Sequence, residues 1–446
     1  MAYVTNLPDT ITIREGRSAN VGLYFRDMIY SSLSYSYYTS TSGGTASSAD
    51  LGAVSGSGAF TVVSSSPYND SDSFSISATR DGIQEQTETA FLVVELSGNM
   101  SFADGDQRQV VEIRIADDNR TTGTDRNDVL YGTNAAESLS GGAGNDSYHV
   151  TAGDMIVEAA GSDMDTVYSQ FTRRLEDNVE KLFLTGTGSV NGAGNDSANV
   201  LTGNAGANRL GGLGGDDTLN GAGGRDTLDG GAGSDLMAGG YGNDTYLVDT
   251  IRDVVREAAG QGIDIVRTTI SHTLADNVEQ LMLTGAGSVN GTGNGSANVL
   301  TGNAGANRLG GLGGDDVLNG GAGDDRLVGG AGLDRLAGGH GADSFVFLSA
   351  ADSTVAFDGR DVIRDFSISQ GDRINLGAID ANAGRAGNQT FSYIDDARFS
   401  GHAGELSARS VANGTLISAD LNGDRAADLA ILLDDRLSLG ADSFIL

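Results

Sequence analysis

Aspartate recurs every nine residues in the middle of the chain, each time five positions after a glycine. The unit is Gly-Gly-x-Gly-x-Asp-x-U-x, where U is a large apolar residue, as in GGAGSDLMA (230–238) and GGYGNDTYL (239–247). Carboxylates are hard oxygen ligands, and Ca²⁺ takes roughly six to eight oxygens. The glycines permit a tight turn and leave backbone carbonyls free to face an ion. The pattern therefore predicts a series of Ca²⁺ sites.

The repeats fall into three arrays in one register, at 123–149, 194–247 and 293–346. The string SANVLTGNAGANRLGGLGGDD occupies 197–217 and returns unchanged at 296–316. Internal repetition on this scale is typical of proteins built from stacked structural units. We therefore expect one architecture across residues 121–343.

The x-U-x triplet of each unit predicts a very short strand with one apolar side chain facing inward. One unit then makes half a turn, and two units make a full turn of roughly 18 residues in a parallel β-roll. Its inner face would be filled by Leu201, Leu210, Leu219, Leu228, Met237 and Tyr246.

In this geometry an ion lies between two loops on the same edge, one full turn apart. The expected aspartate pairs are Asp128 with Asp146, Asp217 with Asp235, Asp226 with Asp244, Asp316 with Asp334, and Asp325 with Asp343. The glycines expected at the sites are Gly221, Gly223, Gly230, Gly239, Gly320, Gly329 and Gly338. The alternative is that these aspartates only cap turns.

Some units depart from the pattern, and two stretches interrupt the arrays. Asn stands at the sixth position in Asn199, Asn208, Asn298 and Asn307, and Glu stands there at Glu137. A neutral amide is a weaker ligand, so sites that include Asn should be looser or empty. The stretches 150–193 and 248–292 lack the glycine and aspartate pattern but alternate polar and apolar residues. We interpret them as metal-free turns of the roll.

These nonapeptides resemble those of the repeats-in-toxin (RTX) family of secreted bacterial proteins. The resemblance implies a Ca²⁺-filled β-roll and export of the unfolded chain through a type I secretion transporter. In that family the export signal lies at the C-terminus.

The stretch 344–446 resembles the C-terminal domain of serralysin-type secreted metallopeptidases, and Asp442–Leu446 resembles the acidic and apolar tail of their export signal. The resemblance implies a β-rich secretion domain. A zinc peptidase also needs a His-Glu-x-x-His helix. The four histidines, His149, His272, His340 and His402, do not form that motif. The sequence also contains no G-x-S-x-G motif and no cysteine, so we predict no catalytic residues.

Residues 1–120 contain no repeat and alternate apolar and polar residues between Gly, Ser and Asp turns, which predicts a β-sandwich. Their strands are expected at 10–13, 20–25, 74–78, 91–96 and 110–115. The segment resembles a Calx-β domain, in which acidic residues at one end bind Ca²⁺. Carried over, the candidate ligands are Glu15, Asp50, Asp81, Glu85, Asp117 and Asp118.

Composition narrows the classes of partner. The 446 residues hold 27 Lys and Arg against 60 Asp and Glu, a net charge of −33, and such a chain repels nucleic acid phosphates unless cations intervene. No apolar run reaches the length of a membrane-spanning helix, and the first residues do not read as a signal peptide. Tyr35 and Tyr37 share one face of a predicted strand and could stack on an extracellular glycan, or else pack in a core.

Together these patterns predict an all-β chain: an N-terminal β-sandwich (1–120), a calcium-bound parallel β-roll solenoid (121–343) and a C-terminal β-rich secretion domain (344–446). We expect a secreted protein that folds on extracellular Ca²⁺ and has a non-enzymatic adhesive, matrix or cell-surface role. The alternative is a secreted enzyme, for example a glycoside hydrolase, with paired carboxylates in the N-terminal domain.

Overall fold

The computed structural model describes residues 122–446 except 133–135, 162 and 383, and it describes the backbone of the strands before them. The chain divides into two compact units, Met1–Leu201 and Thr202–Leu446. The described residues contain strands and two 3₁₀ turns but no α-helix, so the all-β prediction is confirmed. Within the described part, no helix has the length and apolar character needed to cross a membrane.

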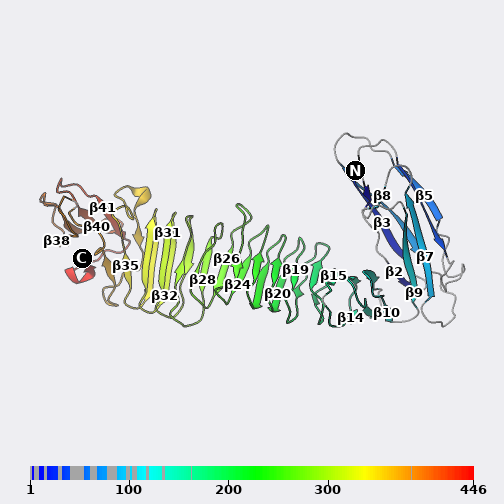
Figure 1. Cartoon of the computed structure of the whole chain (residues 1–446). Coiled ribbons are helices and arrows are strands. Elements are labelled where there is room, and N and C mark those ends of the chain that lie inside the picture. Colours follow the sequence, from blue (N-terminus) through cyan, green and yellow to red (C-terminus); the bar gives the residue numbers. More distant parts are fainter. Residues whose placement is uncertain are drawn as a thin grey trace. The chain divides into compact units, whose positions relative to one another are not determined.

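The backbone of residues 1–122 forms strands that pair mainly in antiparallel fashion (Figure 1). One sheet has the order β6-β3-β1-β8, and the other includes β2-β9-β7-β4-β5. The strands are β1 (Tyr3–Val4), β2 (Thr10–Arg14), β3 (Ser18–Met28), β4 (Leu33–Ser40), β5 (Ser55–Phe60), β6 (Tyr68–Ser77), β7 (Glu88–Leu96), β8 (Ser101–Phe102), β9 (Arg108–Ala116) and β10 (Arg120–Thr122).

The five strands expected in this segment are present, and most are longer than predicted. The alternation of apolar residues marks only the part of a strand that has one apolar face. Ladder hydrogen bonds come from the backbone of any residue except proline, so a strand can run past its apolar positions.

The repeats that follow form short parallel strands. In the first unit these are β11 (Asp128–Tyr131), β12 (Ser138–Ser140), β13 (Ser147–Val150), β14 (Met155–Ile156), β15 (Thr166–Ser169), β16 (Arg173–Arg174), β17 (Lys181–Leu184) and β18 (Gly192–Ala193), while β19 (Val200–Thr202) lies at the boundary. Each strand pairs with the strand two places later in the chain, as β11 pairs with β13. Each full turn therefore contributes one strand to each sheet.

The second unit continues in the same way, and Figure 1 shows its strands stacked in sequence order. They are β20 (Arg209–Gly214), β21 (Thr218–Asn220), β22 (Thr227–Ala232), β23 (Leu236–Ala238), β24 (Thr245–Val248), β25 (Val254–Val255), β26 (Ile265–Thr268), β27 (His272–Thr273), β28 (Gln280–Leu283), β29 (Gly291–Thr292), β30 (Val299–Thr301), β31 (Arg308–Gly313), β32 (Val317–Ala322), β33 (Arg326–Ala331), β34 (Arg335–His340) and β35 (Ser344–Val346).

The register confirms the predicted turn of 18 residues. Leu210 pairs with Leu228 and Leu228 with Tyr246, while Leu219 pairs with Met237 on the other sheet. All five side chains are at most 1% exposed, so they fill the interior of the roll as expected. A single repeat could not bury its one apolar residue alone, and stacking supplies the neighbours.

The two stretches between arrays are also turns of the roll. Tyr246 of β24 pairs with Val266 of β26, which in turn pairs with Leu281 of β28. Val266 and Leu281 are both buried, so the inner apolar column runs on without the nonapeptide pattern.

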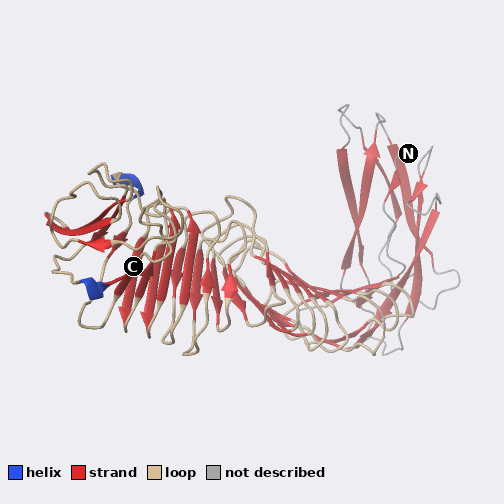
Figure 2. Cartoon of the chain, turned by 60° about the vertical axis from the view of Figure 1, so that its left-hand side comes forward, coloured by secondary structure: helices blue, strands red, loops and turns tan. Residues whose placement is uncertain are grey.

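Parallel stacking extends past residue 343 into the C-terminal segment. β34 pairs with β36 (Val362–Ile363), and β35 pairs with β37 (Arg373–Asn375). The chain then forms β38 (Ser392–Tyr393) and an antiparallel meander of β39 (Glu405–Val411), β40 (Gly414–Asp420) and β41 (Leu429–Leu433). The 3₁₀ turns η1 (Phe357–Gly359) and η2 (Ala441–Ser443) lie in this segment and are blue in Figure 2.

The predicted tail contains a final strand, β42 (Phe444–Ile445), which pairs in parallel with β37. Phe444 is 6% exposed and its ring lies 5.0 Å from that of Tyr393. The tail therefore packs against the rest of the C-terminal segment.

An aromatic stack lies on the outer side of the first unit. Tyr131, His149, Tyr168 and Phe183 occupy matching positions in β11, β13, β15 and β17, and successive ring centroids are 4.6, 4.7 and 5.4 Å apart. Parallel strands place equivalent residues directly above one another, so a repeated aromatic position becomes a stack.

Candidate metal centre

Each sixth-position aspartate lies immediately before a short strand or at its first residue. Its backbone N–H donates a hydrogen bond to the carboxylate of the aspartate one turn later. The backbone N–H of Asp226 donates to Oδ1 of Asp244 over 2.7 Å, and that of Asp325 donates to Oδ1 of Asp343 over 2.8 Å. The same bond joins Asp128 to Asp146, Asp217 to Asp235, and Asp316 to Asp334, over 2.7 to 2.9 Å. The fold thus brings together all five pairs named from the sequence.

The second carboxylate oxygen of these residues is buried and accepts no hydrogen bond. This holds for Oδ1 of Asp128 and for Oδ2 of Asp146, Asp226, Asp235, Asp244, Asp316, Asp325, Asp334 and Asp343. Burying a charged oxygen without a partner is costly. An unpaired oxygen repeated along the Asp-containing turns is the arrangement that a row of cations would satisfy.

Asp420 lies in a turn with oxygen-bearing residues at alternate positions, and its carboxylate differs from those of the repeat aspartates. Its Oδ1 accepts hydrogen bonds from the backbone N–H groups of Asn422 and Gly423, and its Oδ2 accepts one from Arg425. The loop itself satisfies both oxygens, which fits a capped turn. The repeat aspartates are not satisfied in this way.

The first glycine of each repeat leaves space beside the unpaired oxygen. A Cβ atom on Gly221 would lie closer than 3.0 Å to Oδ2 of Asp226 and to the carbonyl oxygen of Gly239 one turn later. Gly230, Gly239, Gly320, Gly329 and Gly338 stand in the same relation to the aspartates five positions on. A Cβ atom on Gly223 would instead meet only Tyr241, with the carbonyl oxygen at 3.6 Å, and no carboxylate within 4 Å, and the role of Gly223 at a calcium site stays a prediction.

The repeats with Asn at the sixth position satisfy that side chain within the loop. Oδ1 of Asn208 accepts the N–H of Asn204, and its Nδ2 donates to Oδ1 of Asn204. Asn307 makes the same two bonds with Asn303. An amide can donate to its neighbours where a carboxylate cannot, which supports the expectation of weak sites at these positions.

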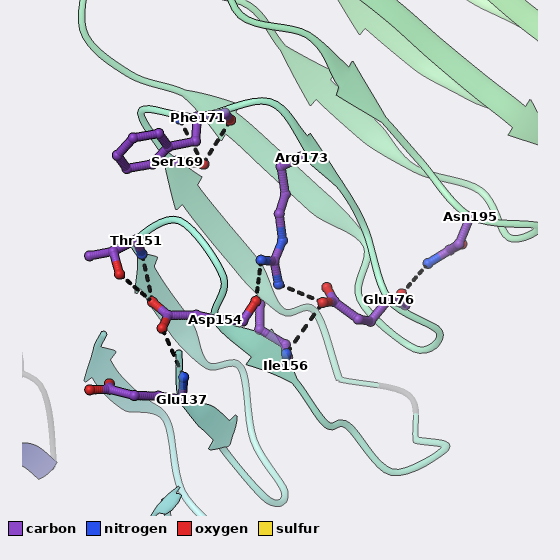
Figure 3. Close-up of polar contacts among 9 residues, drawn as sticks. All are labelled: Glu137, Thr151, Asp154, Ile156, Ser169, Phe171, Arg173, Glu176 and Asn195. Atoms are coloured by element: carbon purple, nitrogen blue, oxygen red, sulfur yellow. Dashed lines mark hydrogen bonds and ion pairs between the residues drawn. The ribbon is translucent and has the colours of Figure 1, made fainter. Parts of the chain in front are cut away.

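The stretches 150–193 and 248–292 between the arrays are the first and second linkers. In the first linker an arginine side chain takes part in the hydrogen bonds of the turn (Figure 3). The Arg173 guanidinium donates to the Asp154 carbonyl oxygen and to Oε1 of Glu176, each over 2.5 Å. The two carboxylate oxygens of Asp154 accept the N–H groups of Glu137 and Thr151. The arginine pairs with Glu176, and backbone N–H groups satisfy the Asp154 carboxylate, so neither oxygen of Asp154 is left free for a metal ion.

Burial sets the protonation of the repeat carboxylates. It raises the pKa of Asp146 to about 8, those of Asp226 and Asp316 to about 7, and those of Asp325, Asp334 and Asp343 to about 6. Repulsion from neighbouring carboxylates adds to the effect, and bonds from backbone N–H groups oppose it. A divalent cation would reverse this preference by stabilising the charged form.

Two aspartates in the C-terminal segment extend the row of hydrogen bonds and were missed from the sequence, although the second oxygen of Asp372 accepts the N–H of Ser367. The N–H of Asp334 donates to Oδ1 of Asp361, and the N–H of Asp343 donates to Oδ1 of Asp372. Burial raises the pKa of Asp361 to about 9, and its Oδ2 has no hydrogen bond. Their spacings of 27 and 29 residues depart from the 18-residue turn, but each begins an Asp-x-Ile triplet that matches Asp-x-U.

The six acidic candidates of the N-terminal segment lie outside the described residues. They are Glu15, Asp50, Asp81, Glu85, Asp117 and Asp118. Their role as ligands stays a prediction.

Family models match the repeats and the C-terminal part of the chain. The RTX calcium-binding nonapeptide repeat matches residues 117–154, 193–228 and 211–246, and the peptidase M10 serralysin C-terminal family matches residues 277–445. The chain carries RTX calcium-binding repeats. These repeats bind several Ca²⁺ ions, and the family matches include no peptidase catalytic domain.

Solved structures similar to parts of the chain include two subunits of a mannuronan C5-epimerase. The AlgE6R2 subunit of the Azotobacter vinelandii mannuronan C5-epimerase is 28% identical, with 36% of this chain and 93% of that chain covered and a TM-score of 0.27. The AlgE6R3 subunit is 29% identical, with 34% and 78% covered and a TM-score of 0.26. The apo Calx CBD1 domain is 22% identical, with 26% and 98% covered and a TM-score of 0.21. No curated protein matches the chain.

We predict that aspartates one turn apart share an ion, whereas neighbouring repeats do not. Asp325→Asn and Asp343→Asn should each remove about one Ca²⁺, and the double variant should lose little more, because both carboxylates serve one edge. Asp316→Asn with Asp325→Asn should lose about two, because these residues precede strands of opposite sheets. Calorimetric stoichiometry measures the difference, and additive losses for the first pair would contradict the shared site.

We also predict that, without calcium, the folded state is less stable at neutral pH than at mildly acidic pH. The pKa values of these aspartates are higher in the folded state than in the unfolded chain, so the folded state binds more protons between about pH 4 and 8. Stability in EGTA should therefore be greatest near pH 4 to 5 and fall as the pH rises through about 6 to 8. Thermal unfolding by circular dichroism across this range is the test. Rising stability between pH 5 and 8 in EGTA would oppose it.

Proposed function

We propose that this chain is a secreted, non-enzymatic calcium-binding protein whose RTX repeats fold when they meet extracellular Ca²⁺. The observation that carries the proposal is the row of buried carboxylate oxygens without hydrogen bonds in the Asp-containing repeats from Asp226 to Asp244 and from Asp316 to Asp343, beside glycines that leave room for an ion. In the absence of Ca²⁺ these charges oppose stacking. When the ions bind, they become the contacts that join successive turns.

Export is proposed to proceed through a type I secretion transporter. The match of residues 277–445 to the serralysin C-terminal family supports this, since RTX proteins with that domain are exported. A chain that stays unfolded at low cytosolic Ca²⁺ would remain able to thread through a channel. The protein would then fold outside the cell, where Ca²⁺ is more concentrated.

The N-terminal segment is proposed to be the displayed module, a Calx-β-like sandwich with its own calcium ligands. The strand pairing of its backbone supports a β-fold. Adhesion, matrix or cell-surface attachment through an extracellular glycan or surface protein would suit a module carried on a rigid roll. A glycan array with the purified protein in Ca²⁺ would identify such a partner.

The proposal predicts that the chain is largely unfolded in EGTA at neutral pH and gains β structure in about 10 mM Ca²⁺. Far-UV circular dichroism and hydrodynamic radius should change together over one titration. Mg²⁺ at the same concentration serves as the control, because it demands octahedral geometry and retains its waters. A fully folded chain in EGTA would contradict the proposal.

Removal of Asp442–Leu446 should reduce secretion and leave Ca²⁺ binding by the 194–247 array intact, because repeats contact only their neighbours. Secreted and intracellular protein would be compared by immunoblot in a host with a type I transporter. Phe444→Ala is the matched control for the truncation, because it removes the buried ring but keeps the rest of the tail. Normal export of the truncated chain would exclude these residues from the signal.

A further inference from the structure

Three carboxylates meet where the second array joins its linker. One oxygen from each of Asp244, Glu257 and Asp264 lies within 4.8 Å of the others. Asp244 closes the last nonapeptide of the array, whereas Glu257 and Asp264 belong to the stretch 248–292, which lacks the glycine and aspartate pattern. Asp244 is 0% exposed and Asp264 is 1% exposed, so the cluster is not a solvated surface patch.

Specific hydrogen bonds hold the three side chains in place. The Tyr246 hydroxyl bonds to Oε1 of Glu257 and also accepts the N–H of Gly239 over 2.6 Å. Oδ1 of Asp264 accepts the N–H of Asp244 over 2.8 Å. Asp264 itself donates its N–H to Glu279 over 2.8 Å. The linker therefore continues the contact that joins one repeat aspartate to the next.

Oxygens aimed at the cluster are left without partners. Oδ2 of the fully buried Asp244 has no hydrogen bond, and neither has Oε2 of Glu257. Burial raises the pKa values of Glu257 to about 7 and of Asp264 to about 6. Carboxylates held together in this way must either bind protons or share a cation.

The same hydrogen bonds recur at the end of the first array, although among the described residues only Asp244, Glu257 and Asp264 bring three carboxylates within 4.8 Å of one another. The Tyr148 hydroxyl bonds to Glu158, the N–H of Asp146 donates to Oδ1 of Asp165 over 2.8 Å, and Oδ2 of Asp146 has no partner. Glu158 and Asp165 are seven residues apart, as are Glu257 and Asp264. Turn capping alone does not require a tyrosine, a glutamate and an aspartate to recur together in both linkers.

We infer that each of these linkers supplies ligands to a terminal calcium site, formed by Asp244, Glu257 and Asp264 in one case and by Asp146, Glu158 and Asp165 in the other. The inference rests on the proposed calcium-dependent folding and revises the expectation that the linkers are metal-free. A third carboxylate adds negative charge to the ligand set, and charge count is one determinant of Ca²⁺ affinity. The terminal sites should fill before the sites inside the arrays and order the linkers with them.

The test uses the full chain with Glu257→Gln and, as a charge-matched control in the same linker, Asp276→Asn. Asp276 is exposed. We expect Glu257→Gln to remove the tightest class of Ca²⁺ sites at one linker, or weaken it about tenfold or more, in calorimetric titrations. The same variant should be more folded than the parent in EGTA at pH 8, because it removes a charge from the cluster. Asp276→Asn should change neither quantity.

A second measurement covers the case in which Glu257→Gln fails to fold. Tyr246 contacts Glu257, and the chain contains no tryptophan, so Tb³⁺ bound at the site should be excited through this tyrosine. Tyr246→Phe retains the ring but should lose part of the Tb³⁺ luminescence. Unchanged luminescence in Tyr246→Phe, or parental Ca²⁺ binding in a folded Glu257→Gln, would overturn the inference. Absence of Ca²⁺ binding by the parent chain would instead overturn the proposed function.

Discussion

The structure depends on how the charge repulsion between carboxylates that stacking brings together is balanced. Where successive turns both carry the repeat aspartate, stacking places one buried carboxylate above the next, and a backbone N–H satisfies only one of the two oxygens, as in Asp244 and Asp343. The apolar interior favours stacking, because an isolated repeat cannot bury its leucine. The edges oppose it until their charge is balanced. The fold therefore depends on the solution around it, and calcium concentration and pH act at the same groups.

The roll could be predicted closely from sequence because its order is one-dimensional. The spacing of nine residues fixes which side chains face inward and which aspartates lie one turn apart, as the pairing of Leu210 with Leu228 illustrates. Since each repeat contacts only its neighbours, local spacing determines most of the three-dimensional arrangement. No long-range information was needed for the five aspartate pairs.

Prediction failed where the spacing changed but the contact did not. Asp361 and Asp372 follow their partners by 27 and 29 residues, and Asp264 follows Asp244 by 20. The roll tolerates longer loops at its edges, whereas a search for a fixed interval does not. The shorter Asp-x-U pattern survives in all three places.

The Arg173 contact also distinguishes two linkers that otherwise look alike. At the matching position the second linker has His272, and at the position of Glu176 it has Ala275. Burial lowers the pKa of His272, so this imidazole is mostly neutral at pH 7 and cannot replace a guanidinium. The first linker therefore has a side-chain ion pair at this edge that does not depend on calcium, and the second linker lacks both of its partners. As calcium is withdrawn, the second linker, which has no such ion pair, should lose its order before the first.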